Sequence, residues 1–226
     1  MQLNARQFFI SIFLDSLFLF PVIFNAGVFA QQSNLSKAVN YLSGFIASDY
    51  FRELKKSNND LALVDTIYLR AVKFEKNDYS NALFALIFTT VPYKSVPIKL
   101  PLLPFIIHFP LTAAPDSIFI LKNRNLPKEL YFDSPKDKFG DKDKLAHFFG
   151  SAFISYSSNI FDLSNLIGYF VEVFENDFKV QSSIDPRDLQ TDSLGDIFGE
   201  LLKKNKNILP SQVMIIRSLL FFKYPL

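Results

Sequence analysis

Six prolines within a short central stretch divide an otherwise helix-forming chain into two parts. They stand at Pro92, Pro97, Pro101, Pro104, Pro110 and Pro115. A proline inside a helix removes a backbone donor and clashes with the preceding turn, so no continuous helix can cross this stretch. On both sides of it, apolar residues recur with the 3.6-residue period of a helix. The sequence therefore predicts a mainly α protein, a compact helical bundle with a proline-rich irregular segment between two helical halves.

The periodic pattern also predicts where the elements lie. Before the prolines we expect helices over residues 34–56 and 77–90. Between these two we expect a helix that is capped by Asn59 or Asp60 and ends at about Phe74. After them we expect helices over residues 141–158, 163–174, 186–204 and 211–222. Between the two sets, a brief strand is expected over 117–121 and a polar loop over 122–140. The organisation is one helical domain over residues 31–226, made of 31–91, a connector over 92–140, a helical module over 141–204 and an apolar helix within 205–226.

Residues 1–30 have the pattern of a targeting segment. Arg6 precedes an apolar run over residues 8–24, and small or short residues lead up to Ala30. The pattern predicts a cleaved signal peptide. The alternative is an uncleaved membrane anchor, because the run approaches the length of a bilayer span, although Asp15 and Pro21 lie within it. Both interpretations predict an exported protein of the periplasm or cell envelope.

Composition excludes several classes of function. The chain has no cysteine, so it has no disulfide, no thiolate zinc site, no cysteine nucleophile and no lipid-modified cysteine. Its 24 basic and 22 acidic residues form no long run of one sign, which predicts no nucleic-acid partner. The 27 phenylalanines and the apolar proline-rich stretch point instead to a membrane surface or an envelope lipid. No protein partner is indicated. His108, among apolar neighbours, is expected to be packed or hydrogen-bonded rather than a ligand.

The other histidine begins the first of three polar groups inside the helical module. On a helix, Asp143 and His147 lie one turn apart on the same face, with Lys144 on the adjoining face. A carboxylate at this distance can fix the tautomer of an imidazole and raise its basicity. The simpler interpretation is that Asp143 caps the helix and His147 is a buried polar residue with a local partner.

The second polar group combines a glycine with two acids. Glu172 has apolar neighbours on most sides, and a buried carboxylate is costly unless it is paired, hydrogen-bonded or protonated. Gly168 lies one turn before it and would allow another helix to approach, while Glu175 follows on the same side. Alternatively, Glu172 lies on a solvated stripe of a short helix.

The third group lies in the helix expected from residue 186. Asp188, Asp192, Gly195 and Gly199 step by four, three and four residues and therefore share one face. The two glycines form a pattern that permits close helix contact. Asp185 suits the N-cap and Asp188 can support the same helix end, so both have a structural explanation. Asp192 lies beyond capping reach and is the better functional candidate.

In this order the three groups resemble the YfiM-type family of periplasmic lipoproteins and, more distantly, VanZ-like membrane proteins. The resemblance covers residues 143–199 and implies a helical module located in the cell envelope. Two features depart from the family pattern: the lipid-bearing cysteine is missing, and Val171 stands where a lysine often precedes the glutamate. The positions that match the pattern are Asp143, Lys144, His147, Gly168, Glu172, Asp188, Asp192 and Gly195.

Three functional hypotheses follow. In the first, the protein is a non-enzymatic envelope protein, structural or binding, whose polar groups form a buried network between helices. In the second, His147, Glu172 and Asp192 are catalytic or metal-ligating groups of a metal-assisted, hydrolase-like enzyme; Asp188 is a further candidate ligand, and the ion would be Mg²⁺, Mn²⁺ or Zn²⁺. In the third, the protein binds lipids or other amphiphiles. No cofactor is certain from the sequence, and a divalent metal is the one it suggests.

Overall fold

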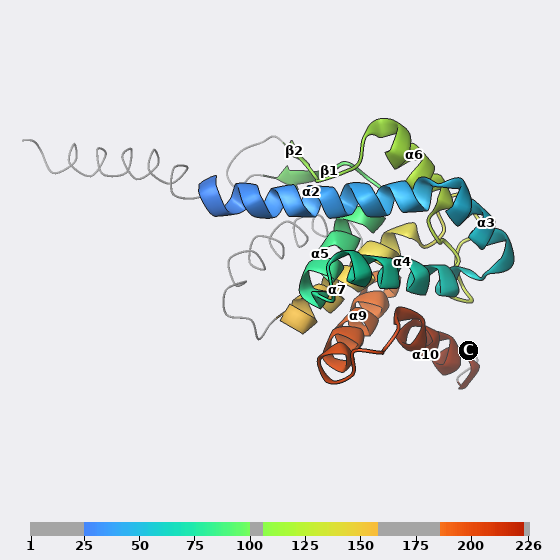
Figure 1. Ribbon diagram of the computed structural model, residues 1–226. Helices are drawn as coiled ribbons and strands as arrows, with labels where there is room; N and C mark the ends of the chain where they lie inside the picture. The colour runs from blue at the N-terminus through green and yellow to red at the C-terminus, as the bar shows by residue number, and fades with distance from the viewer. Residues whose placement is uncertain (1–24, 100–105, 158–185, 224–226) are drawn as a thin grey trace, which may run out of the picture.

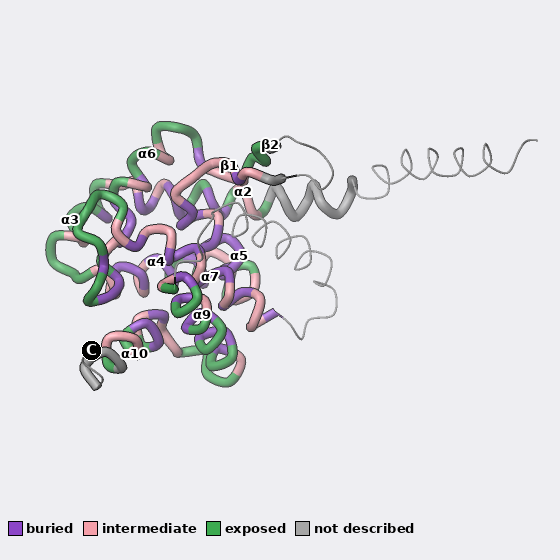
Figure 2. Tube along the Cα trace, turned by 180° about the vertical axis from the view of Figure 1, so that it is seen from behind, coloured by how far each residue is buried: buried purple, intermediate pink, exposed green. Residues whose placement is uncertain are grey.

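The computed structural model describes residues 25–99, 106–157 and 186–223, and Figure 1 shows their arrangement. Within these ranges the chain forms eight α-helices and one two-stranded antiparallel sheet. The helices pack around a common apolar core, which the buried segments in Figure 2 trace through the centre of the molecule. The prediction of a mainly α, compact helical bundle is therefore confirmed.

The first half contains α2 (Asn25–Ala47), α3 (Asp49–Ser57), α4 (Asp60–Phe74) and α5 (Tyr79–Thr90). The prediction of one helix over residues 34–56 was wrong, because the chain breaks at Ser48. The Ser48 side chain caps α3 by accepting a hydrogen bond from the backbone N–H of Phe51 at 3.2 Å. Asn59 and Asp78 cap α4 and α5 in the same way. Local capping chemistry thus sets three of the helix starts.

The proline-rich connector contains β1 (Ser95–Lys99), β2 (Ile106–Pro110) and α6 (Asp116–Asn125). The two strands pair with each other, and both are edges, where proline is tolerated. The expected strand over 117–121 is wrong, because this segment lies in α6. Lys122 anchors that helix: its buried ammonium donates to the carbonyls of Thr89 and Val91 at 2.9 and 2.8 Å. His108, expected to be packed or hydrogen-bonded, is exposed on β2.

The second half contains α7 (Lys142–Ser157), α9 (Pro186–Lys204) and α10 (Pro210–Lys223). These agree with the helices predicted over 141–158, 186–204 and 211–222. The helix expected over 163–174 lies outside the described residues. The polar loop predicted over 122–140 was wrong at its start, because residues 122–125 belong to α6. The segment 126–141 has no regular element but inserts Leu126, Leu130 and Tyr131 into the core. It therefore packs against the helices instead of acting as a free linker.

None of the helices in the described ranges combines the length and the apolar character needed to cross a bilayer.

Candidate functional site

Helices α7 and α9 lie side by side and run in the same direction. Near their starts Lys144 contacts Asp188, further along Gly195 lies against Phe148, and further still Gly199 lies against Ala152. The partners advance together along both helices, so the packing is parallel. The two N-termini consequently meet at one end of the pair.

Two glycines make this close packing possible. A Cβ atom built on Gly195 would lie 2.4 Å from the backbone oxygen of Phe148, and one built on Gly199 would lie 2.6 Å from that of Ala152. Real Cβ atoms do not approach backbone so closely, and the carbonyls belong to the rigid interior of α7. Ser151 and Ser155 supply the small residues opposite the glycines. The helix contact expected for Gly195 and Gly199 is therefore with α7.

The acids gather where the two N-termini meet. Asp143 lies in the first turn of α7 and Asp188 in the first turn of α9. The N-terminus of a helix carries a partial positive charge, and two of them side by side favour carboxylates at this end. Much of the acidic clustering therefore has a structural cause, namely the parallel direction of the helices.

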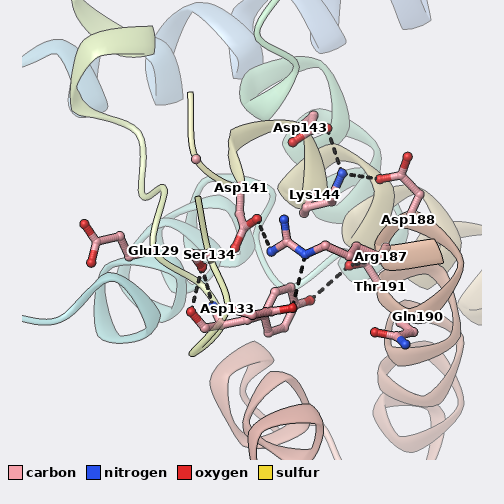
Figure 3. Close-up of polar contacts among 12 residues, drawn as sticks. Glu129, Asp133, Ser134, Asp141, Asp143, Lys144, Arg187, Asp188, Gln190 and Thr191 are labelled. Atoms are coloured by element: carbon pink, nitrogen blue, oxygen red, sulfur yellow. Dashed lines mark hydrogen bonds and ion pairs between the residues drawn. The ribbon is translucent and has the colours of Figure 1, made fainter. Parts of the chain in front are cut away.

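Lys144 is the buried cation of this cluster. Its side chain is only 5% exposed, and its ammonium lies 2.5 Å from Asp188 Oδ1 and 3.0 Å from Asp143 Oδ2 (Figure 3). Asp188 is itself 11% exposed at the side chain. A pair this deep loses most of its hydration, so each partner depends on the other for its charge to be tolerated.

His147 lies between two acids of α9, Asp188 and Asp192. Its Nδ1 lies 3.3 Å from Asp192 Oδ1, and its Nε2 lies 3.7 Å from Asp188 Oδ1. Ser151 donates a second hydrogen bond to Asp192 Oδ1 at 3.1 Å. Burial lowers the pKa of His147, but the hydrogen bond and charge of Asp192, with the charges of Asp188 and Asp143, outweigh it and raise the pKa above its ordinary value.

This pKa shift predicts a pH-dependent stability. A histidine whose folded-state pKa is raised stabilises the fold fully below its unfolded-state pKa of about 6.5, and that contribution is lost as pH rises through the folded-state value. We expect the thermal midpoint of the wild type to exceed that of His147→Gln most at pH 5.5 and least at pH 8.5. A gap that widened with rising pH would show that the acids do not hold His147 protonated.

A second set of charges, which the sequence did not reveal, adjoins the first. Arg187 of α9 lies 2.5 Å from Asp141 Oδ1 and 3.4 Å from Asp133 Oδ2. Asp133 also forms a bidentate ion pair with Arg217 of α10, in which Arg217 Nη2 lies 2.5 Å from Asp133 Oδ2. Asp141, which Figure 3 shows beside Arg187, also bonds Ser134. Its side chain is completely buried. These contacts tie the 126–141 segment to α9 and α10.

Sequence reasoning missed this set because its members are far apart in the chain. Arg217 and Asp133 are 84 residues apart, and Arg187 and Asp141 are 46 apart. Asp141 stands at the start of the helix expected over 141–158, where an aspartate has a local explanation as a cap, whereas its carboxylate bonds Arg187 and Ser134. The one available signal was Arg187 itself, a cation placed between two aspartates at a helix start.

The candidate site residues fall into two sets. Asp143, Lys144, His147, Asp188 and Asp192 come together at the α7–α9 contact. The other candidates lie outside the described residues: Gly168, Glu172, Glu175 and Asp185. The proximity of Glu172 to His147 therefore stays a prediction. Within the described part of the chain, no three histidine or carboxylate side chains converge as a group able to hold a metal ion.

Comparison with known proteins adds no family. A scan against protein-family models finds no match, and searches of the curated proteins and of the solved structures find none either.

Proposed function

We propose that the protein is a non-enzymatic, exported protein of the cell envelope with a structural or binding role, in which the charged groups lock one helical packing. We call these groups the charge network: Asp133, Asp141, Asp143, Lys144, His147, Arg187, Asp188, Asp192 and Arg217. The targeting pattern of residues 1–30 and the resemblance over 143–199 support the location.

One observation carries the structural role: each cation of the charge network contacts a carboxylate of the same network. Lys144 pairs with Asp188, Arg187 with Asp141, and Arg217 with Asp133. Together these pairs connect α7, α9, α10 and the 126–141 segment. Alternative packings of the same helices would leave these buried and partly buried charges unpaired, so the paired network favours one arrangement over the others.

A metal-assisted, hydrolase-like activity is the second candidate. The bond between His147 and Asp192 favours it, since a carboxylate that orients an imidazole is a common feature of catalytic and metal sites. In this alternative Glu172 would complete a site with His147 and Asp192. Against it, Lys144 already provides a positive charge at Asp188, next to the imidazole.

A metal titration separates the two candidates. The thermal midpoint of the wild type would be measured with Mg²⁺, Mn²⁺, Zn²⁺ or EDTA, beside His147→Ala, Glu172→Gln and Asp192→Asn. We expect no saturable metal response, because each of Lys144, Arg187 and Arg217 already pairs with a carboxylate of the network. We also expect His147→Ala and Asp192→Asn each to lose about 1–3 kcal/mol of unfolding free energy.

The control is Glu53→Gln, which removes an exposed acid of α3. It should leave stability within about 0.5 kcal/mol of the wild type. A saturable rise in the midpoint with one metal, present in the wild type and in Glu53→Gln but absent from the three site variants, would replace the structural proposal with the metal-assisted one.

A further inference from the structure

Three lysines from separate parts of the chain meet on the side of the 126–141 segment next to α3. Lys55 of α3 donates to the carbonyl oxygens of Asn125 and Leu126 at 3.1 and 3.2 Å. Two residues after Leu126, the carbonyl of Lys128 accepts the N–H of Asp141 at 2.8 Å, which places Lys128 beside Lys142 at the start of α7. We call Lys55, Lys128 and Lys142 the lysine cluster.

The lysine cluster is half-buried, and within the described residues its ammonium groups donate hydrogen bonds only to backbone carbonyls. Lys128 Nζ donates to the carbonyl of Asp137 at 2.7 Å, and Lys142 Nζ to that of Lys138 at 3.0 Å. None of the three ammonium groups forms an ion pair with a carboxylate in the described part of the chain. Three neighbouring positive charges are thus left without a contacting counter-charge.

The nearby carboxylates are occupied elsewhere. Asp60 accepts the backbone N–H groups of Lys128 and Glu129, both at 2.7 Å. Glu129 pairs with Lys136 at 3.1 Å. Asp137 accepts the N–H groups of two residues in its own turn, at 2.8 and 2.7 Å. The local folding of the 126–141 segment therefore keeps these acids from forming ion pairs with the lysine cluster, although their charges still act on it at longer range.

The electrostatic effects agree with this geometry. Burial lowers the pKa of Lys142, and the charges of Lys55 and Lys128 lower it further, with Asp137 opposing them. Burial also lowers the pKa of Lys55. The charge of Lys128 lowers this pKa further, and the charges of Asp60 and Glu129 partly offset the shift. The three ammonium groups repel one another, and an anion between them would relieve that repulsion.

We propose that Lys55, Lys128 and Lys142 form a binding site for a phosphate group. Three ammonium groups on flexible stems suit a compact oxyanion with acceptors on several sides. The start of α7, where Lys142 is the first helical residue, adds a further positive partial charge. The phosphate is either a free ion or part of a lipid headgroup. Phe139, 71% exposed in the same segment, would reach into the interface of a lipid surface.

The first measurement is calorimetric titration of the full chain with inorganic phosphate, at an ionic strength held constant with chloride. The test variant is Lys128→Gln/Lys142→Gln, which spares Lys55 because Lys55 supports the end of α6. The matched control is Lys73→Gln/Lys204→Gln, which removes the same charge from exposed lysines of α4 and α9. We expect saturable binding in the wild type and the control, and binding about tenfold weaker or more in the test variant.

A vesicle experiment identifies the source of the phosphate. The wild type, the test variant, the control and a further single variant, Phe139→Ser, are each mixed with vesicles of phosphatidylglycerol or of phosphatidylcholine. If phosphatidylglycerol vesicles bind the wild type, and both the test variant and Phe139→Ser bind them less, the phosphate belongs to a lipid headgroup. If inorganic phosphate binds and the vesicles distinguish none of the variants, the site takes free phosphate.

The proposal is overturned if neither probe binds the wild type saturably, or if the test variant binds both probes as the control does. The unfolding of the test variant is measured in the absence of phosphate, so that a loss of binding can be told apart from misfolding. Removing two of three repelling charges should leave the free protein as stable as the wild type or more so. An equal loss of phosphate binding in the test variant and the control would also contradict a localised site.

Discussion

Replacing Gly195 by alanine is expected to lower the free energy of unfolding by about 2–4 kcal/mol, since overpacking a rigid contact forces the backbone apart. The added methyl group would lie 2.4 Å from the carbonyl oxygen of Phe148. That oxygen belongs to the interior of α7 and cannot rotate away as a side-chain end can. Relief requires α9 to move, which also disturbs the contacts of Asp188 and Asp192.

The chain contains a matched control for this substitution. Gly44 lies in α2, and a Cβ built on it meets nothing within 4 Å. Gly44→Ala should therefore stabilise the protein by about 0.5–1 kcal/mol, because alanine is the better helix former. Urea unfolding followed by circular dichroism compares the two variants directly. If Gly195→Ala behaved like Gly44→Ala, the close parallel contact between α7 and α9 would be wrong.

Lys144→Met is expected to have the largest effect among the charged residues, a loss of about 3–5 kcal/mol. It leaves the buried carboxylate of Asp188 without the ammonium that lies 2.5 Å from it. The double variant Lys144→Met/Asp188→Leu removes both charges and fills similar volume with apolar groups. We expect it to recover most of the loss, because replacing both partners of a buried pair is often close to neutral.

The exposed pair of α3 provides the comparison. Lys56 and Glu53 lie 2.9 Å apart with most of their side-chain surface in solvent, so Lys56→Met should change stability by less than about 1 kcal/mol. A double-mutant cycle in urea gives the coupling energy of each pair. If Lys144→Met/Asp188→Leu were as unstable as the single variant, pairing between the two would not be the reason for burying Lys144, and the locking role would be contradicted.

The elements could largely be predicted from the sequence, since amphipathic periodicity and capping are local properties. For α4, one of the two expected caps, Asn59, starts the helix, and the helix ends at Phe74, where the apolar period stops. The errors arose where a distant contact decided the local structure. Nothing within residues 117–121 reveals that Lys122 reaches the end of α5 and fixes a helix there.

The candidate site divides in the same way. Helical spacing was enough to place Asp143, Lys144 and His147 on neighbouring faces, and Asp192 with the two glycines on one face. It did not indicate that α7 and α9 run parallel, which is what brings their acids to one end. Nor could any local pattern pair Arg187 with Asp141 or Arg217 with Asp133, because these partnerships exist only in the assembled bundle.

The parallel direction of α7 and α9 also bears on the order of folding. Two antiparallel helices joined by a short turn can form their contacts progressively from that turn. In contrast, His147 and Asp192 are 45 residues apart in the sequence. Bringing two residues together that are so far apart in sequence costs chain entropy before their contact can stabilise the structure. This cost slows the pairing of α7 with α9. During synthesis, α7 is complete well before its partner exists. We therefore expect Lys144 to stay hydrated until α9 forms, and the two helices to pair in the later stages of folding.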